Sequence, residues 1–201
     1  MKTYFLPLAI FLFSFQLIAQ TNYEQEIIQF QEDLNAEYKN PEESPLTEEE
    51  QAAFEGHKFY PIDSTYRVVA DFKRFKKPKT IEFATSSGHL RKYDKYAIAE
   101  FELNGKTFKL PIYQSHTLRE TKEYKDYLFL PFTDFTSGVE TYGAGRYIDL
   151  SIPEGDTIVI DFNKAYNPFC AYSPNYSCPI PPEANDLKIE IKAGIRGPQD
   201  H

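Results

Sequence analysis

The dipeptide Asn104-Gly105 constrains the fold more than any other feature, because it separates two segments of alternating apolar residues. Asn-Gly is the preferred sequence of the two-residue type I′ turn, whose twist matches that of the flanking strands. A hairpin between residues 97–103 and 106–113 follows, with aromatic rings meeting on one face and opposite charges on the other. The register pairs Leu103 with Lys106, Phe101 with Phe108, Glu100 with Lys109 and Ala99 with Leu110. The predicted inward-facing residues are Ala97, Ala99, Phe101, Leu103, Phe108, Leu110 and Ile112.

Other short apolar segments predict further strands in the same domain. These segments are residues 66–72, 80–85, 127–130, 147–152, 157–162 and 187–193. No crossover helix is predicted between them, which favours antiparallel pairing. We therefore expect a mainly β fold, an antiparallel barrel or sandwich of about eight short strands with an N-terminal helical arm.

The N-terminal part of the chain predicts a leader and then the helical arm. Lys2 precedes an apolar run over residues 4–18 and the small residue Ala19, as in a secretory signal peptide. We expect residues 1–20 to be removed and the protein to be exported, to the periplasm or outside the cell. Residues 21–56 form the arm, in which Ile27, Phe30, Leu34 and Tyr38 make one apolar helical stripe. Residues 57–201 form the β domain.

The charge distribution sets the arm apart from the β domain. Residues 22–55 contain eleven acidic residues and one lysine, whereas the rest of the chain is nearly neutral. An acidic arm argues against nucleic acid or an anionic membrane as a partner. The basic run over residues 73–79 is interpreted as a solvated connection between two strands. No integral membrane segment is expected after cleavage of the leader.

Cys170 and Cys178 are the two cysteines of the chain. In an exported protein a disulfide is the first expectation. Free thiols and a metal-bound thiolate pair are the alternatives, although no histidine lies near either cysteine in the sequence. The four histidines are scattered without ligand spacing, so neither a metal site nor a cofactor is predicted.

Polar residues that carry chemistry gather between residues 128 and 185. Arg146 begins a strand after two glycine-containing turns, and it suits an anionic ligand as well as an internal ion pair with Asp134 or Glu140. Both alternatives remain open. The other candidate ligand-binding residues are Tyr142, Asn163, Tyr166 and Asn167, of which the asparagines serve equally well in turns.

Three blocks of the sequence point to a family. They read FEGHKFYPIDSTYRV, FLPFTDFTSGVETYGAGRYIDL and IDFNKAYNPFCAYSPNYSCPIPPEANDLKIEIKAG. Together they resemble the bacterial family known as domain of unknown function 1684, over about residues 54–194. The family's usual Gly-Leu and Asn-Pro-Pro-Cys are here Gly56-His57 and 167–170 Asn-Pro-Phe-Cys. The first departure argues against a shared catalytic role for His57, and the resemblance itself implies no assigned activity.

Three hypotheses about function follow. The first is a binding protein whose loop-lined pocket holds a small polar or anionic ligand, and it ranks first because no nucleophile–base pair is recognisable. The second is a hydrolase that uses Asp134 and Glu140 as acid and base, with Arg146 stabilising charge. The third is a structural or interaction scaffold without a small-molecule site.

Overall fold

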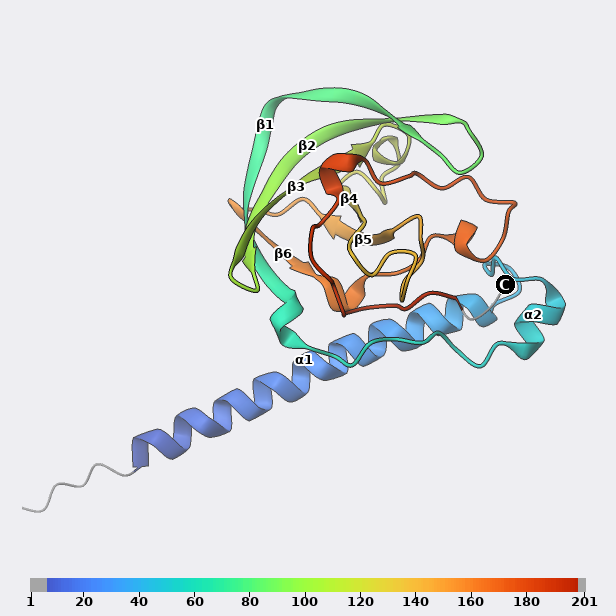
Figure 1. Ribbon diagram of the computed structural model, residues 1–201. Helices are drawn as coiled ribbons and strands as arrows, with labels where there is room; N and C mark the ends of the chain where they lie inside the picture. The colour runs from blue at the N-terminus through green and yellow to red at the C-terminus, as the bar shows by residue number, and fades with distance from the viewer. Residues whose placement is uncertain (1–6, 199–201) are drawn as a thin grey trace, which may run out of the picture.

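A computed structural model describes residues 7–198, with side chains from residue 22 onward. Its main element is a six-stranded antiparallel sheet that curves into a nearly closed barrel (Figure 1). The strands are β1 (Arg67–Ala84), β2 (Leu90–Leu103), β3 (Lys106–Ser115), β4 (Tyr127–Phe132), β5 (Arg146–Ser151) and β6 (Thr157–Asp161). They lie in the order β5-β4-β3-β2-β1-β6. The predicted fold class is confirmed, with six described strands in place of about eight.

The hairpin of β2 and β3 has the predicted turn and register. Asn104 and Gly105 have φ angles of 52° and 71°, the left-handed region that a type I′ turn requires. All four predicted cross-strand pairs are present. The predicted inward residues are buried, except Phe108, which is partly buried against the same core. The Glu100 Oε2 atom lies 3.3 Å from Lys109 Nζ, so the charged pairing is also confirmed.

Strand β1 unites two segments that were predicted as separate strands. β2 is long enough to pair with both, from Phe72 opposite Ala99 to Phe83 opposite Arg91. A register shift between Arg74 and Lys79 takes up the basic run, whose side chains are exposed. The basic run is therefore solvated as predicted, but it continues the strand and does not connect two strands.

The predicted strand over residues 187–193 is absent. The segment is irregular, although its alternation still buries Leu187, Ile191 and Ala193. The carbonyls of Ile191 and Ala193 accept hydrogen bonds from the Arg146 side chain, and the Ile189 carbonyl accepts one from the Phe135 amide. Alternating apolar residues predicted the buried face correctly, but they do not reveal which partner the backbone finds.

Both faces of the curved sheet bury apolar residues. The inner face holds the main core, which includes Phe101, Leu130 and Ile160. A second cluster lies elsewhere on the sheet and is almost entirely aromatic. Its members are Phe83, Tyr93, Tyr113, Phe129 and Tyr147. Because successive residues of a strand point to opposite faces, Tyr147 and Ile148 of β5 enter different clusters.

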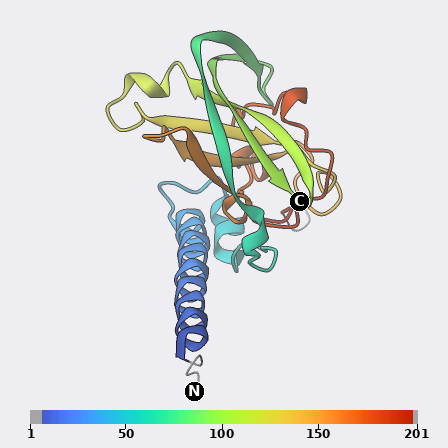
Figure 2. The same ribbon diagram turned by 90° about the vertical axis from the view of Figure 1, so that its left-hand side faces the viewer.

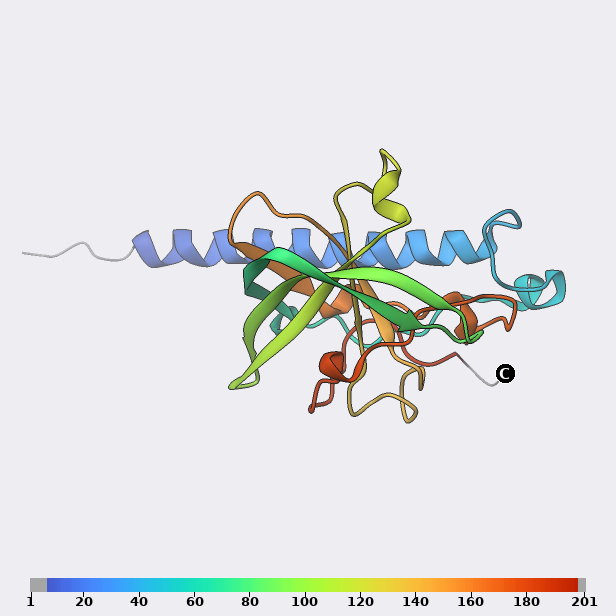
Figure 3. The same ribbon diagram turned by 90° about the horizontal axis from the view of Figure 1, so that it is seen from above.

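Two helices precede the sheet. Helix α1 (Pro7–Lys39) runs along one side of the barrel, and its N-terminal end projects beyond the sheet (Figures 2 and 3). Ile27 and Tyr38 are buried, in keeping with the predicted apolar stripe. Helix α2 (Glu48–Ala53) begins with a capping box between Thr47 and Glu50.

The predicted leader overlaps the start of helix α1. Residues 1–6 lie outside the described residues, and residues 7–20 are helical. Within the part of the chain that the structure describes, no helix combines the length and apolar character needed to span a membrane. Cleavage of the leader stays a prediction.

Candidate functional site

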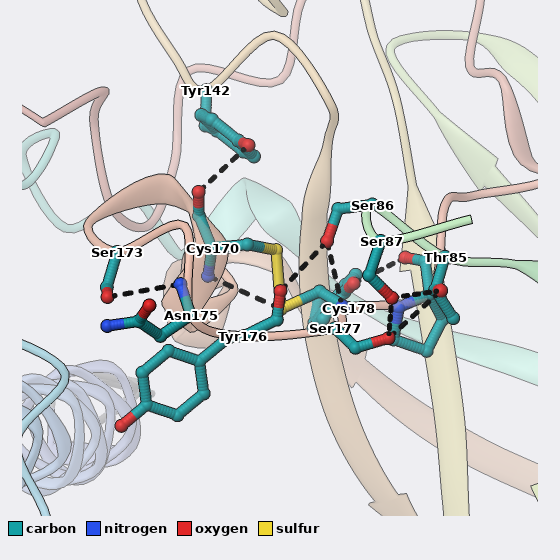
Figure 4. Close-up of a disulfide and its surroundings, with 12 residues drawn as sticks. Thr85, Ser86, Ser87, Tyr142, Cys170, Ser173, Asn175, Tyr176, Ser177 and Cys178 are labelled. Carbon is teal, nitrogen blue, oxygen red and sulfur yellow. Dashed lines mark hydrogen bonds between the residues drawn. A yellow bond between two sulfur atoms is a disulfide. The ribbon is translucent and has the colours of Figure 1, made fainter. Parts of the chain in front are cut away.

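A disulfide shapes the segment that follows β6. Cys170 and Cys178 are bonded, with their Cα atoms 6.2 Å apart, so the first of the three predicted states of the cysteines is confirmed. The closed segment rests on the turn between β1 and β2 (Figure 4). There the Ser86 amide donates to the Cys178 carbonyl at 2.9 Å, and the Ser86 hydroxyl donates to the Tyr176 carbonyl at 3.2 Å. The disulfide and this docking hold residues 170–178 against the sheet.

Helix α1, the outer face of the sheet and the disulfide-linked segment enclose a cleft of about 550 Å³. Most of its lining is aromatic or aliphatic, with a few polar groups. The lining residues are Phe30, Leu34 and Glu37 of α1; Arg91, Leu118, Tyr147 and Asp149; and Tyr166, Pro168, Phe169, Tyr176, Ser177 and Cys178. We call this space the Asp149 cleft. A concave, largely apolar cavity with few polar groups is the usual form of a small-molecule site.

Asp149 supplies the most distinctive polar group of the cleft. It lies on β5, where the two-residue period directs it and Tyr147 away from the inner core. Its Oδ1 atom accepts hydrogen bonds from the hydroxyls of Tyr127 and Tyr166, each at 2.7 Å. Solvent still reaches the side chain. The surrounding protein nevertheless desolvates the carboxylate and raises the pKa of Asp149, an effect that the two hydroxyl donors only partly offset.

The two tyrosines that bond to Asp149 are fixed as proton donors. Desolvation is the main cause that raises the pKa of both Tyr127 and Tyr166, and the nearby Asp149 carboxylate adds to it. Both hydroxyls therefore stay protonated at neutral pH. They fix the position of Asp149 Oδ1 and leave Oδ2 without a hydrogen bond from the described residues.

Two further charged groups line the cleft. Glu37 of α1 has a raised pKa, caused first by burial and then by the carboxylates of Glu43 and Asp149. Arg91, at the start of β2, lies near enough to Tyr147 to lower the pKa of its hydroxyl, although burial raises that pKa overall. Among the described residues, neither Glu37 nor Arg91 forms an ion pair within 4.0 Å.

Arg146 lies inside the barrel and serves as an internal brace. Its side chain is fully buried, and its NH2 group donates to Asp134 Oδ2 at 2.7 Å. The same guanidinium donates to the carbonyls of Ile191, Ala193 and Ile195 at 2.6 to 3.1 Å. Of the two predicted roles, this geometry favours the internal ion pair, because protein acceptors occupy both terminal nitrogens.

Asp134 and Glu140, the predicted acid–base pair, occupy different environments. Asp134 is buried, and its second oxygen accepts from the amide and hydroxyl of Thr136, each at 2.5 Å. Glu140 lies at the surface, where its Oε1 atom is 3.2 Å from Lys192 Nζ. The hydrogen bond from Lys192 lowers the pKa of Glu140. Neither carboxylate lines the Asp149 cleft.

The remaining predicted site residues are divided between the cleft and the scaffold. Tyr166 lines the cleft, as described. Tyr142 donates a hydrogen bond to the Cys170 carbonyl at 3.3 Å. Asn163 is buried and bonds to both the amide and the carbonyl of Asp63, which ties the chain before β1 to the end of β6. Asn167 is also buried and donates to the Arg196 carbonyl at 2.9 Å. Tyr142, Asn163 and Asn167 thus brace loops in this structure.

Comparison with known proteins identifies the family of the chain. Residues 52–196 match the model of a family described as a protein of unknown function, DUF1684. The chain belongs to this family. It is also similar to the solution NMR structure of an uncharacterised protein from Haloarcula marismortui, with 32% sequence identity and a TM-score of 0.70. That match covers 91% of this chain and 98% of the other. A search among curated proteins finds no match.

The sequence contained a signal for the cleft of this DUF1684 protein that the prediction of site residues missed. In the block RYIDL, alternation places Arg146 and Ile148 on one face of β5 and Tyr147 and Asp149 on the other. A carboxylate beside an aromatic residue on the outer face of a predicted strand marks Asp149 as a candidate. Glu37 and Arg91 had no such signal, because they reach the cleft only through the packing of α1 and β2. Within the described residues, no three metal-ligating side chains gather in one place.

Proposed function

We propose that this protein binds a small organic ligand in the Asp149 cleft. One observation carries the proposal: a carboxylate lies in a concave, largely apolar cavity of about 550 Å³, and one of its oxygens accepts no hydrogen bond from the described residues. Asp149 Oδ2 can accept a hydrogen bond or an ion pair from a ligand, while the rings cover the ligand's apolar part. The predicted small polar ligand is retained in this proposal, and its site moves from Arg146 to Asp149.

The walls of the cleft support the proposal because they are positioned before any ligand binds. The disulfide and the hydrogen bonds of Ser86 hold the segment that carries Phe169 and Tyr176. The hydroxyls of Tyr127 and Tyr166 orient the carboxylate. A site whose groups are already ordered loses less conformational entropy on binding, which favours affinity.

A thermal-shift screen of small metabolites tests the proposal directly. Compounds that bind the folded state should raise the melting temperature in a concentration-dependent way. Leu34→Trp, on the cleft side of α1, should fill the cavity and abolish the shift. Ile28→Trp on the same helix is the matched control, since Ile28 is 45% exposed and lies outside the cleft. A hit that stabilises the Leu34→Trp and wild-type proteins equally would contradict the proposal.

Export remains part of the proposal. The apolar run over residues 4–18 and the disulfide support it, because disulfides persist mainly in oxidising compartments. Cell fractionation followed by N-terminal sequencing tests it. We expect a chain that begins near Thr21 outside the cytoplasm, and a full-length cytoplasmic chain would contradict the expectation.

A further inference from the structure

The charges around the Asp149 cleft narrow the chemistry of its ligand. The inference below rests on the proposed function and adds the ligand class to it. Three charged side chains line the cleft: Asp149, Glu37 and Arg91. None of them is neutralised by a protein ion pair among the described residues, whose salt bridges involve other groups.

The two carboxylates favour a cationic group on the ligand. The Asp149 carboxylate contributes to the raised pKa of Glu37, after burial and the carboxylate of Glu43. A ligand ammonium placed at Asp149 Oδ2 would offset this repulsion. The rings of Tyr147 and Tyr166, which meet edge to face with centroids 5.9 Å apart, also line the cleft, and an aromatic ring attracts a cation placed over its face.

Arg91 favours an anionic group on the same ligand. Its planar guanidinium is suited to bidentate bonding of a carboxylate. It lies on the β2 wall beside Tyr147, whereas Glu37 comes from helix α1. The cleft therefore has carboxylate acceptors for a cation on β5 and α1, and the guanidinium donors of Arg91 for an anion on β2.

The remaining lining favours an apolar, ring-shaped body. Phe169 and Tyr176 form an edge-to-face pair with centroids 5.0 Å apart, and Leu34 and Phe30 come from the helix. Aromatic rings on such walls prefer offset or edge-to-face contact with a further ring. We propose that the Asp149 cleft binds a small zwitterion with an apolar or aromatic body, its ammonium at Asp149 and its carboxylate at Arg91.

Three probes with one phenyl body separate the two charged contacts. L-Phenylalanine carries both charged groups, phenethylamine carries the ammonium alone, and 3-phenylpropionate carries the carboxylate alone. Titration calorimetry measures each probe against the wild-type protein and the variants Asp149→Asn and Arg91→Gln. Asp149→Asn keeps the shape of the side chain, and Arg91 is exposed, so circular dichroism should show unchanged folds in both variants.

The expected pattern is specific. The wild-type protein should bind L-phenylalanine at least about tenfold more tightly than either single-charge probe, since an ion pair in a partly desolvated site is worth about 1.4 kcal/mol or more. Asp149→Asn should weaken L-phenylalanine to the level of 3-phenylpropionate. Arg91→Gln should weaken it to the level of phenethylamine. Equal affinity of the three probes, or L-phenylalanine binding that neither variant changes, would overturn the ligand class.

Failure of the ligand class and failure of the proposed function give different results. If metabolites from the screen bind and Leu34→Trp abolishes their binding, while no zwitterionic probe binds, the proposed function stands and the zwitterion is wrong. If neither the probes nor the screened compounds bind, both are wrong.

Discussion

The buried guanidinium of Arg146 gives the sharpest prediction about stability. In Arg146→Leu, Asp134 Oδ2 and the carbonyl oxygens of Ile191, Ala193 and Ile195 lose their donor. Breaking a buried ion pair by removing one partner costs about 3–5 kcal/mol. Each buried carbonyl left unsatisfied adds about 1–3 kcal/mol, less where water enters. We therefore expect a loss of at least about 4 kcal/mol, which lowers the melting temperature by roughly 8–16 °C in a protein of this size.

Urea denaturation followed by circular dichroism measures this loss. Glu140→Gln is the matched control, because Glu140 lies at the surface with Lys192 at 3.2 Å, and an exposed ion pair contributes less than about 1 kcal/mol. Replacing both Asp134 and Arg146 with leucine should cost less than the two single changes added together, since the pair is coupled. A decrease in the free energy of unfolding below about 1 kcal/mol in Arg146→Leu would contradict the structural role of Arg146.

Three further predictions concern titration and the disulfide. Burial lowers the pKa of His57 from 6.5 to about 4. The free energy of unfolding should therefore fall as pH decreases through this window. In His57→Leu, urea midpoints measured at several pH values should fall less steeply. Desolvation by the surrounding protein raises the pKa of Asp149 above its ordinary 3.8, although solvent reaches the side chain. The wild-type protein should therefore lose stability as pH rises through the raised pKa, and Asp149→Asn should be the more stable protein at pH 7 but not at pH 3. Replacing Cys170 and Cys178 with serine should cost about 2–3 kcal/mol in the same assay, because the bond closes a short loop.

Each of these three has a result that would count against it. If stability falls equally steeply at low pH in His57→Leu and in the wild-type protein, another group governs this loss of stability. A less stable Asp149→Asn protein at pH 7 would mean that the carboxylate is not desolvated. Equal stability with and without the disulfide would place the order of the 170–178 segment in its contacts with the β1–β2 turn alone.

The sequence predicted those parts of the fold that depend on neighbouring residues. Asn104-Gly105 determines its own turn, and the turn then determines the register of β2 and β3. The strand predicted over residues 187–193 is wrong, because the segment bonds to a guanidinium and to loop backbone groups that are distant in sequence.

The candidate site was harder to predict, because its residues converge only through tertiary packing. Alternation along β5 places Arg146 on the same face as Ile148, which is buried, but the prediction left the role of Arg146 open between a ligand contact and an internal ion pair. The same alternation places Asp149 on the outer face, a signal that the prediction of site residues did not use. No local pattern indicated that α1 would bring Glu37 to that face. The sequence of a helix shows which of its sides is apolar, but it does not show which surface that side packs against.

The location of ligand binding is the central claim, and a chemical-shift titration tests it most directly. L-Phenylalanine is added stepwise to the ¹⁵N-labelled protein while backbone amide shifts are followed. We predict saturable shifts at Tyr147 and Asp149 of β5, at Tyr166 and around Glu37, all of which line the cleft. These shifts should disappear in Leu34→Trp and persist in Ile28→Trp. Saturable shifts confined to Arg146 and residues 187–195, or shifts that persist unchanged in Leu34→Trp, would contradict the assignment of the cleft. Absence of saturable shifts would contradict the zwitterionic ligand class.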